Sequence, residues 1–142
     1  MSRLTTRGSV RLPLRKALEA WFTAHADHDF YTGVAGRLAY VRAPKKWPRP
    51  YAVLTILTAV PRDTLTERID EVPLQIMVFA DSSLEAEELA SMASNLFGGR
   101  VISGDGLKDF EFSRGEDVPT LPDEDGVWGA GIQLTGLVET SQ

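Results

Sequence analysis

The clearest hydrophobic pattern in the chain is the two-residue alternation between Glu71 and Ala80. One side of this alternation consists of Val72, Leu74, Ile76, Val78 and Ala80, and the other consists of Pro73, Gln75, Met77 and Phe79. A period of two is typical of a strand, so a strand is predicted from about Arg68 to Ala80. The first set is uniformly apolar and is expected to face the helices.

Two other segments repeat their apolar residues with helical spacing. The first begins near Pro13 and is expected to fade near Asp27, before a turn; its apolar stripe is Leu14, Ala17, Leu18, Trp21 and Phe22. The second begins at Ser82, whose hydroxyl can cap the helix, with Glu85 as the return partner of a capping box. Gly98-Gly99 is expected to end it as a left-handed cap. Its predicted buried stripe is Ala86, Leu89, Ala90, Ala93, Leu96 and Phe97.

Four further strands are predicted over residues 37–43, 51–60, 107–114 and 127–139, with a proline-rich loop after the first and an acidic loop over 115–126. The order is therefore α-β-β-β-α-β-β. It predicts an α+β fold, a single mainly antiparallel β-sheet with two helices packed on one face. Residues 1–11 contain three arginines and no acid and are predicted to form a basic N-terminal arm, followed by a single α/β domain over 12–142.

The second face of the predicted sheet is mixed, although a sheet face open to water should be cleanly polar. Met77 and Phe79 are large apolar residues on that side, and only Thr55 and Thr58 interrupt the strand over 51–60. We therefore expect other copies of the same chain to cover this face.

Composition narrows the class of protein. The chain has 142 residues, which is about one domain, and its 43% hydrophobic and 25% charged residues are those of a soluble globular protein. The absence of cysteine rules out disulfides and favours a reducing, cytoplasmic setting. No apolar run approaches the roughly 20 residues that span a bilayer, so no membrane contact is expected. A net charge of −5 argues against a protein that coats nucleic acid over its whole surface.

Residues with catalytic or metal-binding chemistry are few. His25, Asp27, His28 and Asp29 lie close together near a helix end, but a zinc site needs a further fixed ligand, and a solvated helix terminus is the favoured interpretation. The glycine-rich segments do not connect a strand to a helix, as a phosphate-binding loop requires. No catalytic, cofactor-binding or metal-binding residue is therefore assigned, no cofactor is expected, and the chain is predicted not to be an enzyme.

Opposite charges are concentrated in two of the predicted loops. The proline-rich loop over 42–49 is basic, and the loop over 115–126 is acidic. Both loops could simply be solvated. Pairing of one subunit's basic loop with the next subunit's acidic loop would instead give a heterologous contact that can close a ring, with Trp47 as an anchor. The candidate interface residues are Arg42, Lys45, Lys46, Trp47, Arg49, Met77, Phe79, Glu116, Asp117, Asp123, Glu124 and Asp125. Contact of the basic loop with DNA phosphates is the second choice.

The order of elements and several stretches resemble the tail terminator or tail-completion proteins of tailed bacteriophages, the group that includes the lambda tail terminator. The similar stretches are RPYAVLTILTA, TERIDEVPLQIMVFADSSLEAEELASMASNLFGG and VWGAGIQLTGLVE. Together with the first helix they cover most of residues 12–139.

The resemblance implies a structural virion protein that forms a hexameric ring, terminates the tail tube and joins it to the head connector. It implies as partners further copies of the chain, the tail tube protein and the head connector or neck protein, and it leaves room for DNA in the lumen. Assembly would take place in the bacterial host cytoplasm, into the tail or neck of the virion. The alternatives are a neck, or head–tail adaptor, protein of the same particle and a monomeric ligand-binding α/β domain.

Overall fold

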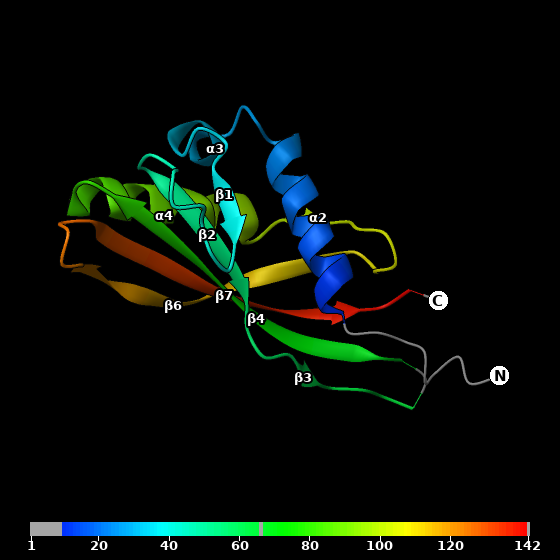
Figure 1. Ribbon diagram of the computed structural model, residues 1–142. Helices are drawn as coiled ribbons and strands as arrows, with labels where there is room; N and C mark the ends of the chain where they lie inside the picture. The colour runs from blue at the N-terminus through cyan, green and yellow to red at the C-terminus, as the bar shows by residue number, and fades with distance from the viewer. Residues whose placement is uncertain (1–9, 66, 142) are drawn as a thin grey trace.

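The computed structural model describes residues 10–65 and 67–141 and shows an α+β fold with a mostly antiparallel, strongly curled sheet (Figure 1). Three helices occur in this part of the chain: α2 (Arg11–Ala24), α3 (Asp29–Gly33) and α4 (Ser83–Phe97). Within the same residues, no helix is long and apolar enough to cross a membrane.

Within the described residues the sheet has seven strands in the order β1-β2-β4-β7-β6-β5, with β3 paired to β4. The strands are β1 (Leu38–Tyr40), β2 (Tyr51–Ile56), β3 (Val60–Pro61), β4 (Ile69–Ala80), β5 (Val101–Ile102), β6 (Phe110–Pro122) and β7 (Trp128–Glu139). Only β1 and β2 pair in parallel. This order places β1 and β6 near opposite edges of the sheet.

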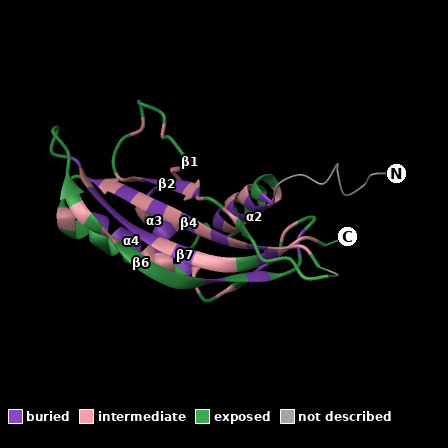
Figure 2. Ribbon diagram, turned by 90° about the horizontal axis from the view of Figure 1, so that it is seen from below, coloured by how far each residue is buried: buried purple, intermediate pink, exposed green. Residues whose placement is uncertain are grey.

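The inner face of the sheet is built by the apolar set that the alternation in β4 predicts. Val72, Leu74, Ile76, Val78 and Ala80 are all fully buried, which confirms the prediction. They belong to one core cluster with Leu14 and Leu18 of α2, Phe30 of α3, and Leu96 and Phe97 of α4. Figure 2 shows this alternation as bands of buried and half-buried residues along β4.

Helix α4 begins and ends as its sequence predicts. Ser82 has extended backbone, and its hydroxyl accepts a hydrogen bond from the Glu85 N–H at 3.2 Å. The helix ends at Phe97, and Gly99 takes the left-handed conformation with a φ of 68°. All six residues of the predicted stripe are buried.

Substitution of Ser82 by alanine is expected to lower the free energy of unfolding by about 1 kcal/mol, because a first-turn N–H of α4 loses its acceptor. Urea denaturation measures the change. Ser83→Ala, one residue further along, is the matched control and should have little effect. Equal stability of the Ser82 and Ser83 variants would contradict the capping role.

The prediction of an acidic loop over 115–126 is wrong for most of these residues. Strand β6 continues to Pro122, and only residues 123–127 connect it to β7. The pairing of β6 with β7 shifts register between Arg114 and Asp117 and again between Val118 and Leu121. Beyond Glu111, β5 does not pair with β6. Such an edge position tolerates bulges, prolines and acids.

The other differences from the sequence prediction are local. Helix α2 ends at Ala24, and the short helix α3 occupies part of the predicted turn. The strand predicted over 51–60 is divided, because β2 ends at Ile56 and β3 begins at Val60. Residues 1–9 of the predicted basic arm lie outside the described residues. Arg11 is the first residue of α2, and its guanidinium donates to the carbonyl groups of Ile56 and Leu57.

Candidate functional site

The outer face of the sheet, opposite the buried face of β4, carries a cluster of large apolar side chains. We call this cluster the apolar patch: Trp47, Tyr51, Val53, Met77 and Phe79. The register pairs Tyr51 with Phe79 and Val53 with Met77. The rings of Tyr51 and Phe79 stack with centroids 5.3 Å apart, and Trp47 lies edge-on to Tyr51 at 6.2 Å. Loop and strand residues thus form one continuous surface.

Two glycines of β7 allow the patch to lie flat on the sheet. Gly129 is paired with Phe79, and Gly131 is paired with Met77. A methyl group at Gly131 would lie 2.3 Å from the Met77 sulphur and 2.8 Å from the Ile76 carbonyl oxygen. The side chains of Met77 and Phe79 therefore fold over bare backbone, and each is half-buried.

A polar pair bounds the patch on the same face. The Gln133 amide donates to the Gln75 amide oxygen at 3.3 Å. Thr55 of β2 is paired with Gln75 in the register. The outer face is thus apolar towards the end where β4 leads into α4, and it is polar in its middle.

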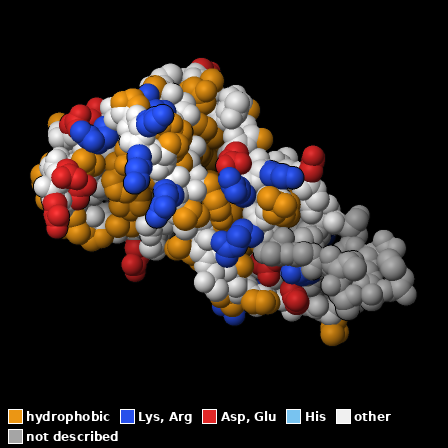
Figure 3. All heavy atoms as spheres, in the orientation of Figure 1, with side chains coloured by type: hydrophobic (Ala, Val, Ile, Leu, Met, Phe, Trp, Pro, Cys, Tyr) orange, Lys and Arg blue, Asp and Glu red, His pale blue; other side chains and the backbone are white. Residues whose placement is uncertain are grey.

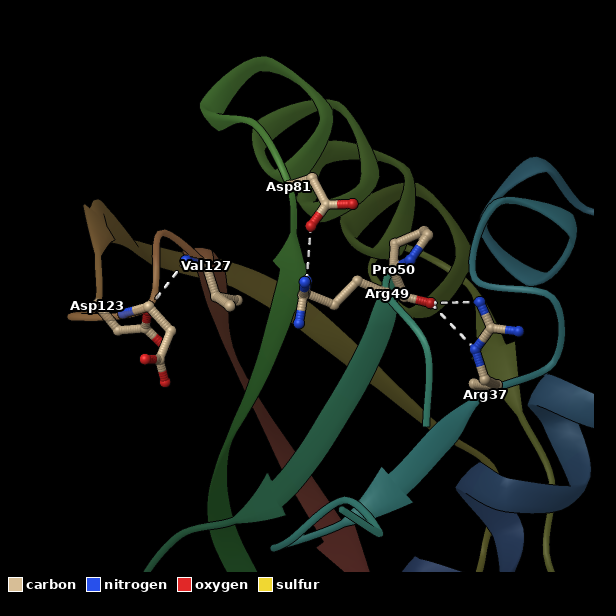
Figure 4. A network of polar contacts seen from close by, with 7 residues as sticks. Arg37, Arg49, Pro50, Asp81, Asp123 and Val127 are labelled. Atoms are coloured by element: carbon tan, nitrogen blue, oxygen red, sulfur yellow. Dashed lines mark hydrogen bonds and ion pairs between the residues drawn. The ribbon is translucent and has the colours of Figure 1, made fainter. Parts of the chain in front are cut away.

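The predicted basic loop contains a closed β-turn over Pro44–Trp47, which we call the lysine turn. The Trp47 N–H donates to the Pro44 carbonyl at 3.1 Å, so that Lys45 and Lys46 lie at the tip, where both are exposed. At the base of the loop, the Arg37 guanidinium donates to the Pro50 carbonyl at 2.9 and 3.2 Å (Figure 4). The lysine turn is therefore held from both its aromatic end and its base.

Arg49, which the sequence assigns to a subunit interface, has a partner in its own chain. Its guanidinium lies 2.6 Å from the carboxylate of Asp81, at the end of β4 (Figure 4). The hydrogen bond and charge of Asp81 raise the pKa of Arg49, and the charge of Asp123 adds to this effect. Both side chains of the pair are exposed, so its contribution to stability is small. Asp81 was not among the residues singled out from the sequence.

Lys45 and Lys46 differ from Arg49, because neither has an ion-pair partner among residues 10–65 and 67–141. Arg42 is likewise exposed and without such a partner in this part of the chain. The lysine turn therefore offers positive charge that no acidic residue in the described part of the chain pairs with.

The acidic residues predicted as one loop are divided between strand and turn. The Asp123 carboxylate accepts from the N–H groups of Asp125 and Val127 at 2.8 and 2.9 Å and so closes the β6–β7 hairpin (Figure 4). Glu116 and Asp117 lie in β6, where Asp117 is 3.3 Å from the Arg114 guanidinium. Glu124 lies in the hairpin turn and is exposed. Asp123 thus has a structural role that its charge alone did not indicate.

Charge is strongly asymmetric along the chain. Residues 1–50 hold ten of the 15 Lys and Arg but three of the 20 Asp and Glu. Figure 3 shows Lys and Arg side chains spread over the face that carries α2, β1 and the loop after β1. The other 17 acids all follow residue 50 and are distributed over β4, α4, β6, β7 and the segments before and between them. The net charge of −5 conceals this separation.

A groove of about 670 Å³, which we call the α4–β6 groove, lies between α4 and the irregular part of β6. Its floor includes Ala130 and Ile132 of β7, which are almost fully buried. Glu87 on one wall and Asp117 on the other contribute carboxylates. The Thr120 hydroxyl donates to Glu87 at 2.7 Å and joins the two walls. Sequence reasoning missed this groove, because it depends on the register shifts in β6.

The histidines near the end of α2 have structural partners. His28 Nδ1 accepts from the Phe30 N–H at 3.0 Å and caps α3, while Nε2 lies 3.0 Å from the Asn95 side-chain oxygen. His25 Nδ1 lies 2.8 Å from the Trp21 carbonyl. In the described part of the chain, no group of three or more His, Cys, Asp or Glu is placed to hold a metal ion. His28 therefore joins α3 to α4, whereas His25 bonds to the last turns of α2.

Comparisons with known proteins identify the family to which the chain is similar. The model of the family described as tail completion protein gp17 matches residues 16–127. Among solved structures, a chain of the virion of a native gene transfer agent particle superposes with a TM-score of 0.62 and 18% identity, over 90% of this chain and 98% of that chain. A second solved protein has a TM-score of 0.55 and 20% identity over 94% of each chain. These two likenesses are of fold. No curated protein sequence matches.

Proposed function

Because the chain belongs to the family of tail completion protein gp17 and is a structural protein of a phage-type tail, we propose that its copies form a closed ring. The ring terminates the tail tube and joins it to the head connector. The mechanism is steric: a ring that fits the last ring of the tube, but lacks the surface that adds another, stops growth. No chemical reaction is needed.

The observation that carries the ring is the apolar patch. Large apolar side chains cover the β4–α4 end of the outer sheet face, and they are only half-buried within one subunit, apart from Val53. Tryptophan, tyrosine and arginine are enriched in the residues that contribute most to binding at protein interfaces. A stable contact buries about 800 Å² on each partner. A neighbouring copy of the chain is the proposed cover.

The charged residues proposed for the interface fall into two groups. Arg49 and Asp123 are already engaged within the subunit, with Asp81 and with the hairpin backbone. Lys45 and Lys46 on one side, with Glu116 on the other, therefore become the principal charged groups expected to meet between subunits. Asp117 can join them, because its pair with Arg114 is exposed and weak. Arg42, Glu124 and Asp125 lie at the margins of these groups.

Native mass measurement over a wide range of concentration tests the ring. The proposal predicts one closed oligomer, with a hexamer as the expected size, and imaging of labelled particles should place it at the head-proximal end of the tube. A label on the head side without contact to the tube would instead indicate a neck adaptor. A chain that stays monomeric at every concentration and does not bind tube ends would contradict the proposal.

A further inference from the structure

We propose that the lysine turn of one copy docks into the α4–β6 groove of the next copy. This inference rests on the proposed ring and names the contact from which the ring is built. The occupant of the groove is a second copy of this chain, which joins head to tail with its neighbour.

The lysine turn has the properties of a preformed binding element. Its hydrogen bond from Trp47 to Pro44 is closed in the single subunit, and Trp47 is fixed against Tyr51 of the apolar patch. Lys45 and Lys46 are exposed at its tip and have no ion-pair partner among the described residues. A turn that is already ordered loses less conformational entropy on binding than a loop that must first be ordered.

The α4–β6 groove has the complementary charge and a suitable size. Its walls carry the carboxylates of Glu87 and Asp117 against one guanidinium, that of Arg114. The Arg114–Asp117 pair is exposed on both sides and is therefore weak, so Asp117 can exchange its partner. The volume of about 670 Å³ falls within the range of roughly 300–1,000 Å³ of pockets that enclose drug-sized ligands, which admits the tip of a β-turn.

The lysine turn and the α4–β6 groove are different, well-separated surfaces of the subunit, so a contact between them is heterologous. The lysine turn follows β1, and the groove is walled by β6, four strand spacings away in the order β1-β2-β4-β7-β6. At about 4.8 Å per spacing this separation is about 19 Å across the sheet. A contact between two different surfaces repeats from subunit to subunit and closes a ring when the rotation allows. The apolar patch, which shares Trp47 with the turn, lies next to this contact.

Engineered disulfides can test the contact cleanly, because the chain contains no cysteine. We expect the double variant Lys46→Cys with Ser91→Cys to form, on oxidation, a ladder of covalent oligomers that ends at the mass of the ring. Ser91 lines the groove, and both positions are exposed. The matched control is Lys16→Cys with Ser91→Cys, in which the first cysteine lies on α2; it should remain monomeric in denaturing gels.

The outcomes separate this inference from the ring itself. A ring by native mass measurement without a covalent ladder would overturn the docking of the turn and leave the ring standing. A fast-migrating monomer with an internal disulfide would also overturn it. Absence of any oligomer, in the double variant and in the unmodified chain, would contradict the ring.

A charge swap gives an independent readout. Reversal of Lys45 and Lys46 to glutamate is expected to weaken subunit association at least about tenfold, as is reversal of Glu87 and Asp117 to lysine. Mixing the two reversed variants should restore both turn–groove contacts, because each turn then meets a groove of opposite charge in the other variant, and so yield rings in which the two variants alternate. Lys16→Glu is the control and should leave association unchanged. If the swap impairs tube capping while the ring stays intact, a basic segment of a tube protein occupies the groove and the inference is wrong.

Discussion

A chain that carries Phe79→Glu is expected to fold but to remain monomeric. Phe79 lies on the outer face of β4, stacked on Tyr51, so its loss should cost about 0.5–1.5 kcal/mol of folding stability. In the ring, a carboxylate would be buried in an apolar contact. Removal of such an anchor weakens binding by about 2 kcal/mol or more, roughly 30-fold for each contact. Analytical ultracentrifugation measures the loss of the oligomer.

Gln75→Glu is the matched control for this variant. It adds the same charge to the same face of the same strand, and the new carboxylate can still accept the hydrogen bond from Gln133. Because position 75 lies in the polar middle of the face, Gln75→Glu should assemble normally. If both variants form rings, the apolar patch is not a subunit contact.

The second large effect is a loss of folding stability, expected when Gly131 is replaced by alanine. An alanine there places a methyl group 2.8 Å from the Ile76 carbonyl oxygen, which belongs to the backbone of the neighbouring strand, so the strands must move apart. Overpacking of this kind costs about 1–3 kcal/mol, and we expect Gly131→Ala to lower the free energy of unfolding by that amount. The same methyl group lies 2.3 Å from the Met77 sulphur and should push that side chain out of the patch.

Two comparisons isolate the cause. Gly129→Ala should cost less, because the nearest atom to its methyl group is a side-chain carbon of Phe79, at 3.2 Å. In a Met77→Ala background the cost of Gly131→Ala should fall but not vanish, because the carbonyl contact remains. A Gly131 variant as stable as the original chain in urea denaturation would contradict the close strand approach.

The sequence predicts best where local signals and burial agree. In β4 the alternation of apolar residues follows the true faces of the strand, because one face is fully buried. In α4 the stripe, the Ser82 cap and the terminal glycines all indicate the same limits. The resemblance to tail-completion proteins, inferred from the order of such elements, is confirmed by the family match.

The missed features depend on position in the sheet. The acids and prolines of residues 115–122 are typical of a loop, yet they form the end of β6 because that strand lies at an edge, where only β7 specifies the pairing. The five-residue helix α3 is too short for a periodic pattern to indicate it. The only local sign that a helix starts here is Asp29, an acidic residue of the kind that is favourable in a first helical turn, and His28 precedes it as the cap.

The candidate site was only partly accessible to sequence reasoning. The sequence predicts Trp47, Met77 and Phe79 as interface residues, which stays a prediction; the structure brings Trp47 and Phe79 into contact with the same Tyr51. The pairing of Arg49 with Asp81 and the α4–β6 groove both join segments that are far apart in sequence. No local pattern records such contacts, because the fold alone decides which surfaces meet.

If neighbouring copies cover the apolar patch, the rate at which Met77 is oxidised in the assembled ring should show it. Met92 of α4 is the internal reference, because it is half-buried like Met77 and lies away from the patch. We expect oxidation of Met77 relative to Met92 to slow strongly on assembly, compared with the same chain diluted until native mass measurement shows the dissociated subunit. An equal ratio in assembled and dissociated protein would show that the patch stays open to water and would contradict the account.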